Sequence, residues 1–207
     1  PKQPAQTVET YTTTLTGGAF SGATRIIKQG EGILVLPNVT EKHTGETNVW
    51  QGTLMFDGKM ESSPVWLNRH TTLISNGGQF MGGLKADYNA TIYPGGKDNV
   101  GAITASTLEL GFGSRIVIDG SNGQLDKINA NTLTVEAKTD DVWKEFGPRY
   151  KTPVIQLNYA GTLEAGTYEL GSIGSVNGDV SDLLIEGVDN SLKASLAYQD
   201  GKLLLVV

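Results

Sequence analysis

The sequence contains no cysteine, and its 207 residues include only two histidines, His43 and His70. The lack of cysteine excludes disulfides, thiolate catalysis and the common cysteine zinc sites. Two histidines leave few members for a Ser-His-Asp triad or a histidine metal site. The phosphate-binding glycine motifs and the Gly-x-Ser-x-Gly motif of serine hydrolases do not occur either. We therefore expect no cofactor and no resident metal.

Positive charge and long apolar runs are also scarce. Sixteen basic side chains stand against 22 acidic ones, which gives a net charge of −6. A protein that neutralises the phosphates of a nucleic acid needs the opposite balance. No apolar stretch approaches the ~18 residues that a membrane helix requires. The sequence thus predicts neither a nucleic-acid partner nor membrane insertion by this chain.

Helical periodicity is absent, whereas glycine is abundant. The chain has 27 glycines, about twice the usual ~7% share, and no window keeps an apolar stripe at helical spacing for three turns. Short runs rich in β-branched residues occur instead, and most end at a turn signal such as Asp57-Gly58 or Asp200-Gly201. The runs lie at 33–36, 53–56, 65–67, 72–74, 91–93, 107–110, 115–118, 132–135, 154–157, 167–170, 183–185 and 203–207. They predict an all-β chain.

A spacing of 20 residues favours a solenoid over a sandwich. The pattern at residues 32–38, Gly-Ile-Leu-Val-Leu-Pro-Asn, recurs at 52–58 as Gly-Thr-Leu-Met-Phe-Asp-Gly. One coil of a parallel solenoid has about that length, and its strands stack ~4.8 Å apart on those of the next coil. We expect inward apolar columns, glycines at the corners, a polar lead-in over residues 1–16, and a single domain over residues 17–207.

Eleven positions between residues 28 and 54 follow a known repeat pattern. They are Lys28, Gly30, Gly32, Leu34, Leu36, Thr44, Gly45, Thr47, Val49, Gly52 and Leu54. This segment resembles the autotransporter-associated β-strand repeat. His43 stands where that family usually has tyrosine, and Trp50 where a small polar residue is common.

A weaker likeness covers the C-terminal part. Residues 126–135, 166–170 and 200–207 are similar to the ends of autotransporter passengers and to β-helical ends of secreted proteins from Bacteroides-type bacteria. The two resemblances imply a right-handed, single-stranded parallel β-helix. They also imply export across the outer membrane, a secreted or bacterial cell-surface location, and a larger polypeptide of which this chain is a part.

Three tryptophans, Trp50, Trp66 and Trp143, are the candidate ligand-binding residues, because an exposed aromatic ring can stack on a sugar. The structural alternative is that each packs under a loop. Strict alternation with Leu54 would point Trp50 inward, whereas the family register takes Val49 as the inward residue. The sequence leaves both orientations open.

The polar candidates have structural alternatives as well. Asn68-Arg69-His70 could belong to a polysaccharide lyase, in which a basic side chain removes a proton beside a calcium-bound carboxylate. A calcium site needs gathered acids, yet the aspartates are dispersed along the sequence, and several adjoin turn residues. They are Asp87, Asp98, Asp119, Asp126, Asp140 and Asp141. No pair of carboxylates stands out as that of a glycosidase, so a turn or surface role is the favoured interpretation.

Three functional hypotheses remain. The first is a non-catalytic, secreted or cell-surface module that acts as a scaffold or an adhesin-like domain and contacts glycans or host and cell-surface components. The second is a carbohydrate-binding accessory module of a glycan-degrading protein. The third is a polysaccharide lyase or hydrolase in its own right.

Overall fold

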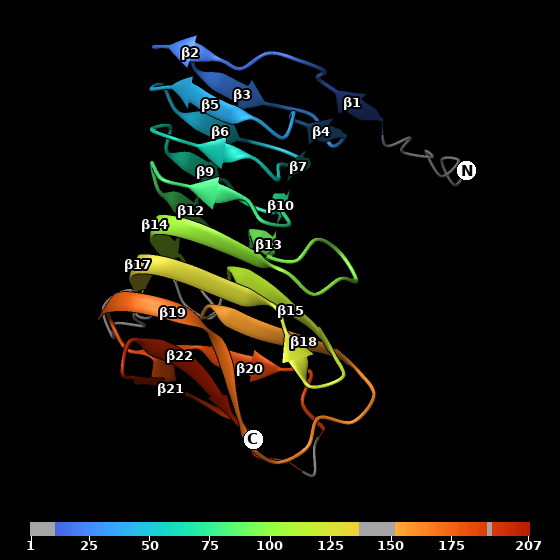
Figure 1. The fold of residues 1–207 in the computed structure, drawn as a ribbon, viewed down its shortest axis with the longest axis vertical. Coiled ribbons are helices and arrows are strands. Elements are labelled where there is room, and N and C mark those ends of the chain that lie inside the picture. Colours follow the sequence, from blue (N-terminus) through green and yellow to red (C-terminus); the bar gives the residue numbers. More distant parts are fainter. Residues whose placement is uncertain (1–10, 137–151, 190–191) are drawn as a thin grey trace, which may run out of the picture.

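The computed structural model describes residues 11–136, 152–189 and 192–207. In these ranges the regular structure is β, apart from one short 3-10 helix, η2 (Val180–Asp182). Parallel strands stack in regular rungs along one long axis, as Figure 1 shows. The predicted all-β parallel β-helix is confirmed.

The first face of the solenoid is a single row of parallel strands. Its members are β1 (Thr12–Thr14), β4 (Ile33–Val35), β7 (Thr53–Met55), β10 (Thr72–Ile74), β13 (Thr91–Tyr93), β15 (Arg115–Ser121), β18 (Val154–Ala160) and β20 (Leu184–Glu186). From β4 to β13 the strands begin at residues 33, 53, 72 and 91, so the predicted repeat of about 20 residues holds. Because β1 pairs with β4, residues 12–14 of the expected lead-in contribute to this face.

The other two faces begin as separate rows and then merge. The second face contains β2 (Ser21–Gly22), β5 (Thr40–His43), β8 (Lys59–Met60) and β11 (Gln79–Phe80). The third contains β3 (Ile26–Lys28), β6 (Thr47–Val49), β9 (Val65–Leu67) and β12 (Leu84–Ala86). Both β11 and β12 pair with the nine-residue β14 (Ala102–Leu110). On its other side β14 pairs in parallel with the equally long β17 (Lys127–Val135). The coil therefore changes from three short strands to two long ones.

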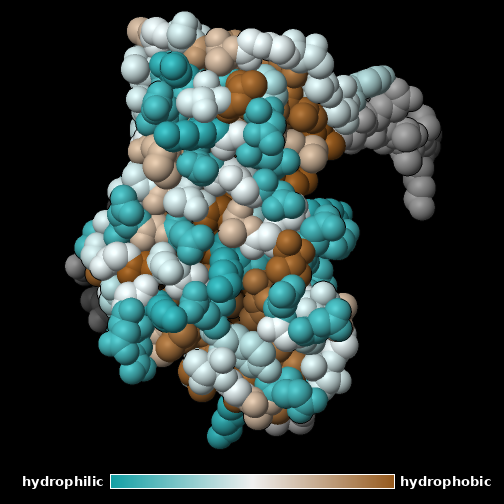
Figure 2. Space-filling view, viewed as in Figure 1, coloured by the Kyte–Doolittle hydropathy of each residue, from teal (hydrophilic) through white to brown (hydrophobic). Residues whose placement is uncertain are grey.

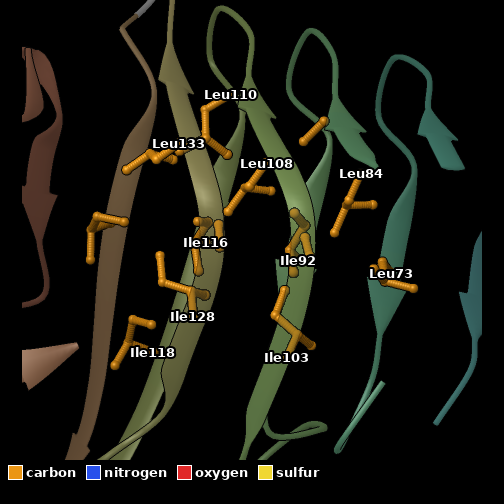
Figure 3. Packing of buried hydrophobic residues seen from close by; sticks show 14 of the residues in the cluster. Leu73, Leu84, Ile92, Ile103, Leu108, Leu110, Ile116, Ile118, Ile128 and Leu133 are labelled. Carbon is orange, nitrogen blue, oxygen red and sulfur yellow. The ribbon is translucent and has the colours of Figure 1, made fainter. Parts of the chain in front are cut away.

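Inward side chains form apolar columns because like positions stack in register. On the first face Leu54, Leu73 and Ile92 follow one another on successive rungs, and each is fully buried. Phe56 and Phe80 fill the space between faces with an edge-on contact, their ring centroids 6.1 Å apart. Figure 3 shows the column side chains pointing into the interior from both sides.

One corner of each coil needs a left-handed backbone. The residues with positive φ there are Gly30 (78°), Gly52 (72°), His70 (59°), Asn89 (59°) and Gly113 (68°). Glycine adopts this conformation without steric cost. At Gly52 a second constraint acts, since a Cβ atom would lie 2.4 Å from the carbonyl oxygen of Gly32 on the preceding rung. The repeat glycines are therefore corner residues.

The C-terminal end departs from the parallel pattern. The long β19 (Thr167–Asn177) pairs with β22 (Lys202–Val206), and β22 pairs with β21 (Ser195–Gln199), both in antiparallel orientation. The apolar run at 203–207 is thus a central strand, with Leu203 and Leu205 fully buried.

A second hairpin joins β15 to β16 (Gln124–Leu125) through the predicted Asn122-Gly123 turn. Within the described ranges, no helix is long and apolar enough to cross a bilayer.

Candidate functional site

Two of the three candidate tryptophans lie on the outer surface of the third face. Val49 points into the core and is fully buried, whereas the next residue, Trp50, is 55% exposed. Trp66, in the middle of β9 between buried Val65 and Leu67, is 44% exposed. The family register therefore gave the correct orientation of Trp50, and simple alternation with Leu54 did not. Trp143 lies outside the described residues.

The two tryptophans are neighbours on adjacent rungs. Trp66 pairs with Asn48, which lies two residues before Trp50 on the same outward side of the chain. This diagonal arrangement separates the two backbone positions by roughly 7–8 Å. Ile27, 49% exposed, pairs with Asn48 from the other side. We call the surface formed by Ile27, Trp50 and Trp66 the tryptophan face.

Polar and charged groups border the tryptophan face. The outward row continues from Trp66 to Lys85 and Glu109, which form an ion pair at 3.4 Å. On the other side, the Glu46 carboxylate accepts hydrogen bonds from Asn48 Nδ2 and from Arg25, each at 3.0 Å. The surface can therefore offer rings for stacking beside donors and acceptors for hydroxyl groups.

The Asn68-Arg69-His70 segment forms the corner next to Trp50. Asn68 Nδ2 donates to the carbonyl oxygen of Val49 at 3.1 Å, and Thr71 Oγ1 donates to the carbonyl oxygen of Asn68 at 2.6 Å. The Arg69 guanidinium lies 4.7 Å from the centre of the Tyr88 ring, a cation–π geometry. Together with the positive φ of His70, these contacts favour the turn interpretation of the segment.

The other histidine is buried inside the solenoid. His43 Nε2 lies 2.9 Å from Thr47 Oγ1, and the ring packs edge-on against Phe20 with centroids 6.1 Å apart. Burial lowers the pKa of His43, although the nearby Glu41 carboxylate opposes the shift. The neutral ring is thereby favoured. The ring is fully buried and packs inside the solenoid.

Three aspartates that are dispersed in the sequence meet under the loop at residues 94–101. The Asp126 carboxylate accepts hydrogen bonds from the backbone N–H groups of Gly101 (2.7 Å) and Asp119 (2.9 Å). Asp119 in turn accepts from the backbone N–H of Asp98 at 2.9 Å and from Asn158 Nδ2 at 2.6 Å. Sequence reasoning missed this cluster because 28 residues separate its ends, and the only local signal is an Asp next to turn residues.

These carboxylates hold the loop in place. Burial raises the pKa of the Asp126 carboxyl to about 6, against the opposing effect of its backbone N–H donors and with a further upward push from Asp119. A shallow hollow of about 390 Å³ lies beside the loop, lined in part by Asp98, Asn158 and Tyr159. Among the residues that the structure describes, no group of three acids or histidines is placed to hold a metal ion.

Comparison with known proteins adds no further constraint. No protein-family model matches the chain, and a search of curated proteins finds no match either.

Proposed function

We propose that this chain is a non-catalytic β-solenoid module, secreted or displayed at a bacterial cell surface, that acts as a scaffold or adhesin-like domain. One observation carries the proposal. The polar side chains considered as catalytic candidates, such as Asn68 and Asp126, form hydrogen bonds that hold corners and loops in place, whereas Trp50 and Trp66 are exposed on the outer surface. Large aromatic side chains on an outer face are typical of contact surfaces.

The location is the part of the proposal that rests on the repeat resemblance alone. It is tested by antibody labelling of intact cells that produce the protein, with permeabilised cells as the reference. We expect labelling of intact cells or recovery from the medium. A signal confined to permeabilised cells would contradict the surface role.

Carbohydrate binding is a second candidate, and the tryptophan face favours it. Indole rings bordered by an amide, a carboxylate and an ammonium group match the alternating apolar and hydroxyl surfaces of a sugar. The glycan can run across adjacent rungs, because Trp50 and Trp66 occupy neighbouring ones. Such a module would assist an attached glycan-degrading enzyme.

A glycan array with tryptophan variants tests the second candidate. We expect Trp50→Ala and Trp66→Ala each to reduce binding at least about fivefold, since stacking of one aromatic ring is worth roughly 1–3 kcal/mol in comparable contacts. Trp66→Phe keeps a ring and should retain most of the binding. Leu184→Ala, at an exposed site on the far end, is the matched control. Trp143→Ala completes the candidate set.

The outcomes separate the two candidates. Binding that survives both substitutions on the tryptophan face would place the sugar elsewhere. A silent array would remove the carbohydrate candidate and leave a protein or cell-surface ligand for the scaffold.

A further inference from the structure

Three consecutive coils carry enlarged connections where the first face gives way to the second. The connections of the preceding coils are short and comprise residues 36–39, 56–58 and 75–78. The next three are the loop at residues 94–101, the β15–β16 hairpin and the loop at residues 161–166. They project on the same side of the molecule, at the right of Figure 1. Insertions gathered on one side of a solenoid often form its binding surface, because the stacked rungs do not need them.

Buried carboxylates fix the loop at residues 94–101 in place. Asp126, which is fully buried, accepts a hydrogen bond from the backbone N–H of Gly101 at 2.7 Å. Asp119, 3% exposed, accepts one from the backbone N–H of Asp98 at 2.9 Å. Burying a carboxylate is costly unless it is hydrogen-bonded, and here its hydrogen bonds go to loop backbone. The loop therefore presents a preformed surface.

The β15–β16 hairpin is anchored as well, and it stands between two hollows. Its Gly123 N–H donates to the Tyr159 hydroxyl at 2.7 Å. The hollow on the β16 side has a volume of about 450 Å³ and is lined in part by Gln124 and Tyr168. The hollow on the β15 side has a volume of about 390 Å³ and is lined in part by Tyr159. Val100, 37% exposed, lines both. Each volume falls within the range of small-molecule sites.

Each hollow places one tyrosine ring among amide and hydroxyl groups. On the β16 side Tyr168 lies with Gln124 and Thr167, and on the β15 side Tyr159 lies with Asn158. A tyrosine offers a flat apolar ring that ends in a hydroxyl, and an amide both donates and accepts hydrogen bonds. This combination suits a sugar, whose rings present apolar C–H faces with hydroxyl groups around them.

The charges around the hollows favour an uncharged ligand. Among the described residues that line them, Lys127 is the one cationic side chain. Its ammonium pairs with the Glu169 carboxylate at 3.2 Å, and Lys202 pairs with the same carboxylate at 2.8 Å. The hollow on the β15 side carries Asp98 and Asp119 instead. A uronate or a phosphate would meet these carboxylates with no unpaired cation to offset the repulsion.

We propose that the two hollows form one binding site for a short, neutral oligosaccharide, which passes over Val100 with sugar rings against Tyr159 and Tyr168. The amides and hydroxyls beside each ring bond the hydroxyl groups of the sugar. The site lies where the first face meets the second, whereas Trp50 and Trp66 lie on the third face. It is therefore separate from the tryptophan face and independent of the function proposed above.

Titration of the full chain with hexameric sugars of different charge tests the ligand class. The neutral probes are cellohexaose, xylohexaose and mannohexaose, the anionic probe is hexagalacturonate, and the cationic probe is the glucosamine hexamer. Affinity is taken from the slowing of amide exchange in the 94–101 loop and the β15–β16 hairpin as sugar is added. We expect at least one neutral probe to bind more tightly than both charged ones, with an affinity that salt does not change.

A blocking substitution tests the position of the site. Val100→Arg puts a long side chain into the wall that the hollows share, and it should weaken binding at least about tenfold, as the loss of two or three hydrogen bonds would. Leu15→Arg, on the first coil and also 37% exposed, is the matched control and should bind as the wild type does. Circular dichroism should show unchanged strand content in both variants.

The tryptophan variants separate this site from the tryptophan face. In the double variant Trp50→Ala, Trp66→Ala the slowing of exchange in the loop and the hairpin should persist. Its loss there, or its persistence in Val100→Arg, would overturn the assignment of the site. Failure of every neutral probe to slow exchange, or tighter binding of a charged probe, would overturn the assignment of the ligand, whatever the glycan array shows for the tryptophan face.

Discussion

At the scale of single residues, one corner of the coil can be occupied by either glycine or a larger residue. Gly52 and His70 have φ values of 72° and 59° at the same corner of successive coils, where the strand register places His70 one position before the equivalent of Gly52. Gly52→Ala combines this φ with a collision at 2.4 Å, so we expect a loss of roughly 2–3 kcal/mol in the free energy of unfolding. His70→Gly should cost nothing, because it relieves a left-handed conformation worth about 1–2 kcal/mol. Urea titrations measure both, and equal losses would contradict the assignment.

The Asp126 carboxyl gives stability a pH dependence of known sign. Its pKa rises from an ordinary 3.8 to about 6 on folding, chiefly through burial. Between these values the unfolded chain has released the proton that the folded chain retains, so the contribution of Asp126 to stability falls as pH rises through this window and is constant above it. Asp126→Asn removes the titration. We expect the stability of the wild type minus that of the variant to decrease from about pH 4 to about pH 6. A flat or rising difference in unfolding free energy would contradict this.

Residue contacts divide into those that local sequence predicts and those that it does not. The sequence left the orientation of Trp50 open, because simple alternation and the repeat register disagreed, and the exposed Trp50 beside buried Val49 agrees with the repeat register. The meeting of Asp98, Asp119 and Asp126 could not be predicted, since it depends on a long loop folding back over a hairpin. The tryptophan face was predicted only as separate residues, because the pairing of Asn48 with Trp66 requires the rung register.

At the scale of secondary-structure elements, β22 is the strand on which the C-terminal end depends. It lies between β19 and β21, and its Leu203 and Leu205 side chains are fully buried. Deletion of Leu203–Val207 should expose two strand edges and yield insoluble protein. The soluble fraction after expression measures this, and a soluble product with an unchanged melting temperature would contradict it.

Point variants within β22 separate burial from strand loss. Leu205→Ala should cost about 2–5 kcal/mol, as large-to-small changes do in a packed core. Val206→Ala, at a site 37% exposed on the same strand, should stay within about 0.5 kcal/mol of the wild type. Similar losses for the two variants in thermal unfolding would argue against the packing of β22 described above.

The strands that the sequence predicted share one property. All 12 apolar runs coincide with strands, because their inward residues are large and aliphatic. The strands that it missed are short or polar, such as β5 (Thr-Glu-Lys-His) and β8 (Lys-Met). These form because neighbouring rungs supply hydrogen-bond partners, which no local pattern reveals. The antiparallel ending was unpredicted for the same reason.

At the scale of the whole molecule, each rung contacts mainly its two neighbours. Stability in such an array is close to a sum of rung and interface contributions, and unfolding begins at the weaker end. We expect amide hydrogen exchange, measured by mass spectrometry, to be fastest in β1, β2 and β3 and slowest around β13, β14 and β15. Uniform protection along the axis would contradict this gradient.

The outer surface follows the same one-dimensional order. Figure 2 shows hydrophilic and apolar residues intermixed along the visible side of the solenoid, with apolar patches near the first coils and farther down the axis. Because columns on the inside fix the register, side chains on the outside can vary without disturbing the core. Substitutions of outward side chains alone can therefore create a contact surface such as the tryptophan face without changing the fold.

Because two faces merge at β14, the two ends of the molecule should differ in their resistance to a pulling force. Rungs near the N-terminus are held by strands of two to four residues, whereas β14 and β17 are each nine residues long and β19 is eleven. A force on the first coils would break the few backbone hydrogen bonds of one rung at a time and release the chain rung by rung. The same tension on the longer strands must break many bonds together. A tether fixed at its C-terminal end would therefore lengthen under load from the tip while its base stayed folded.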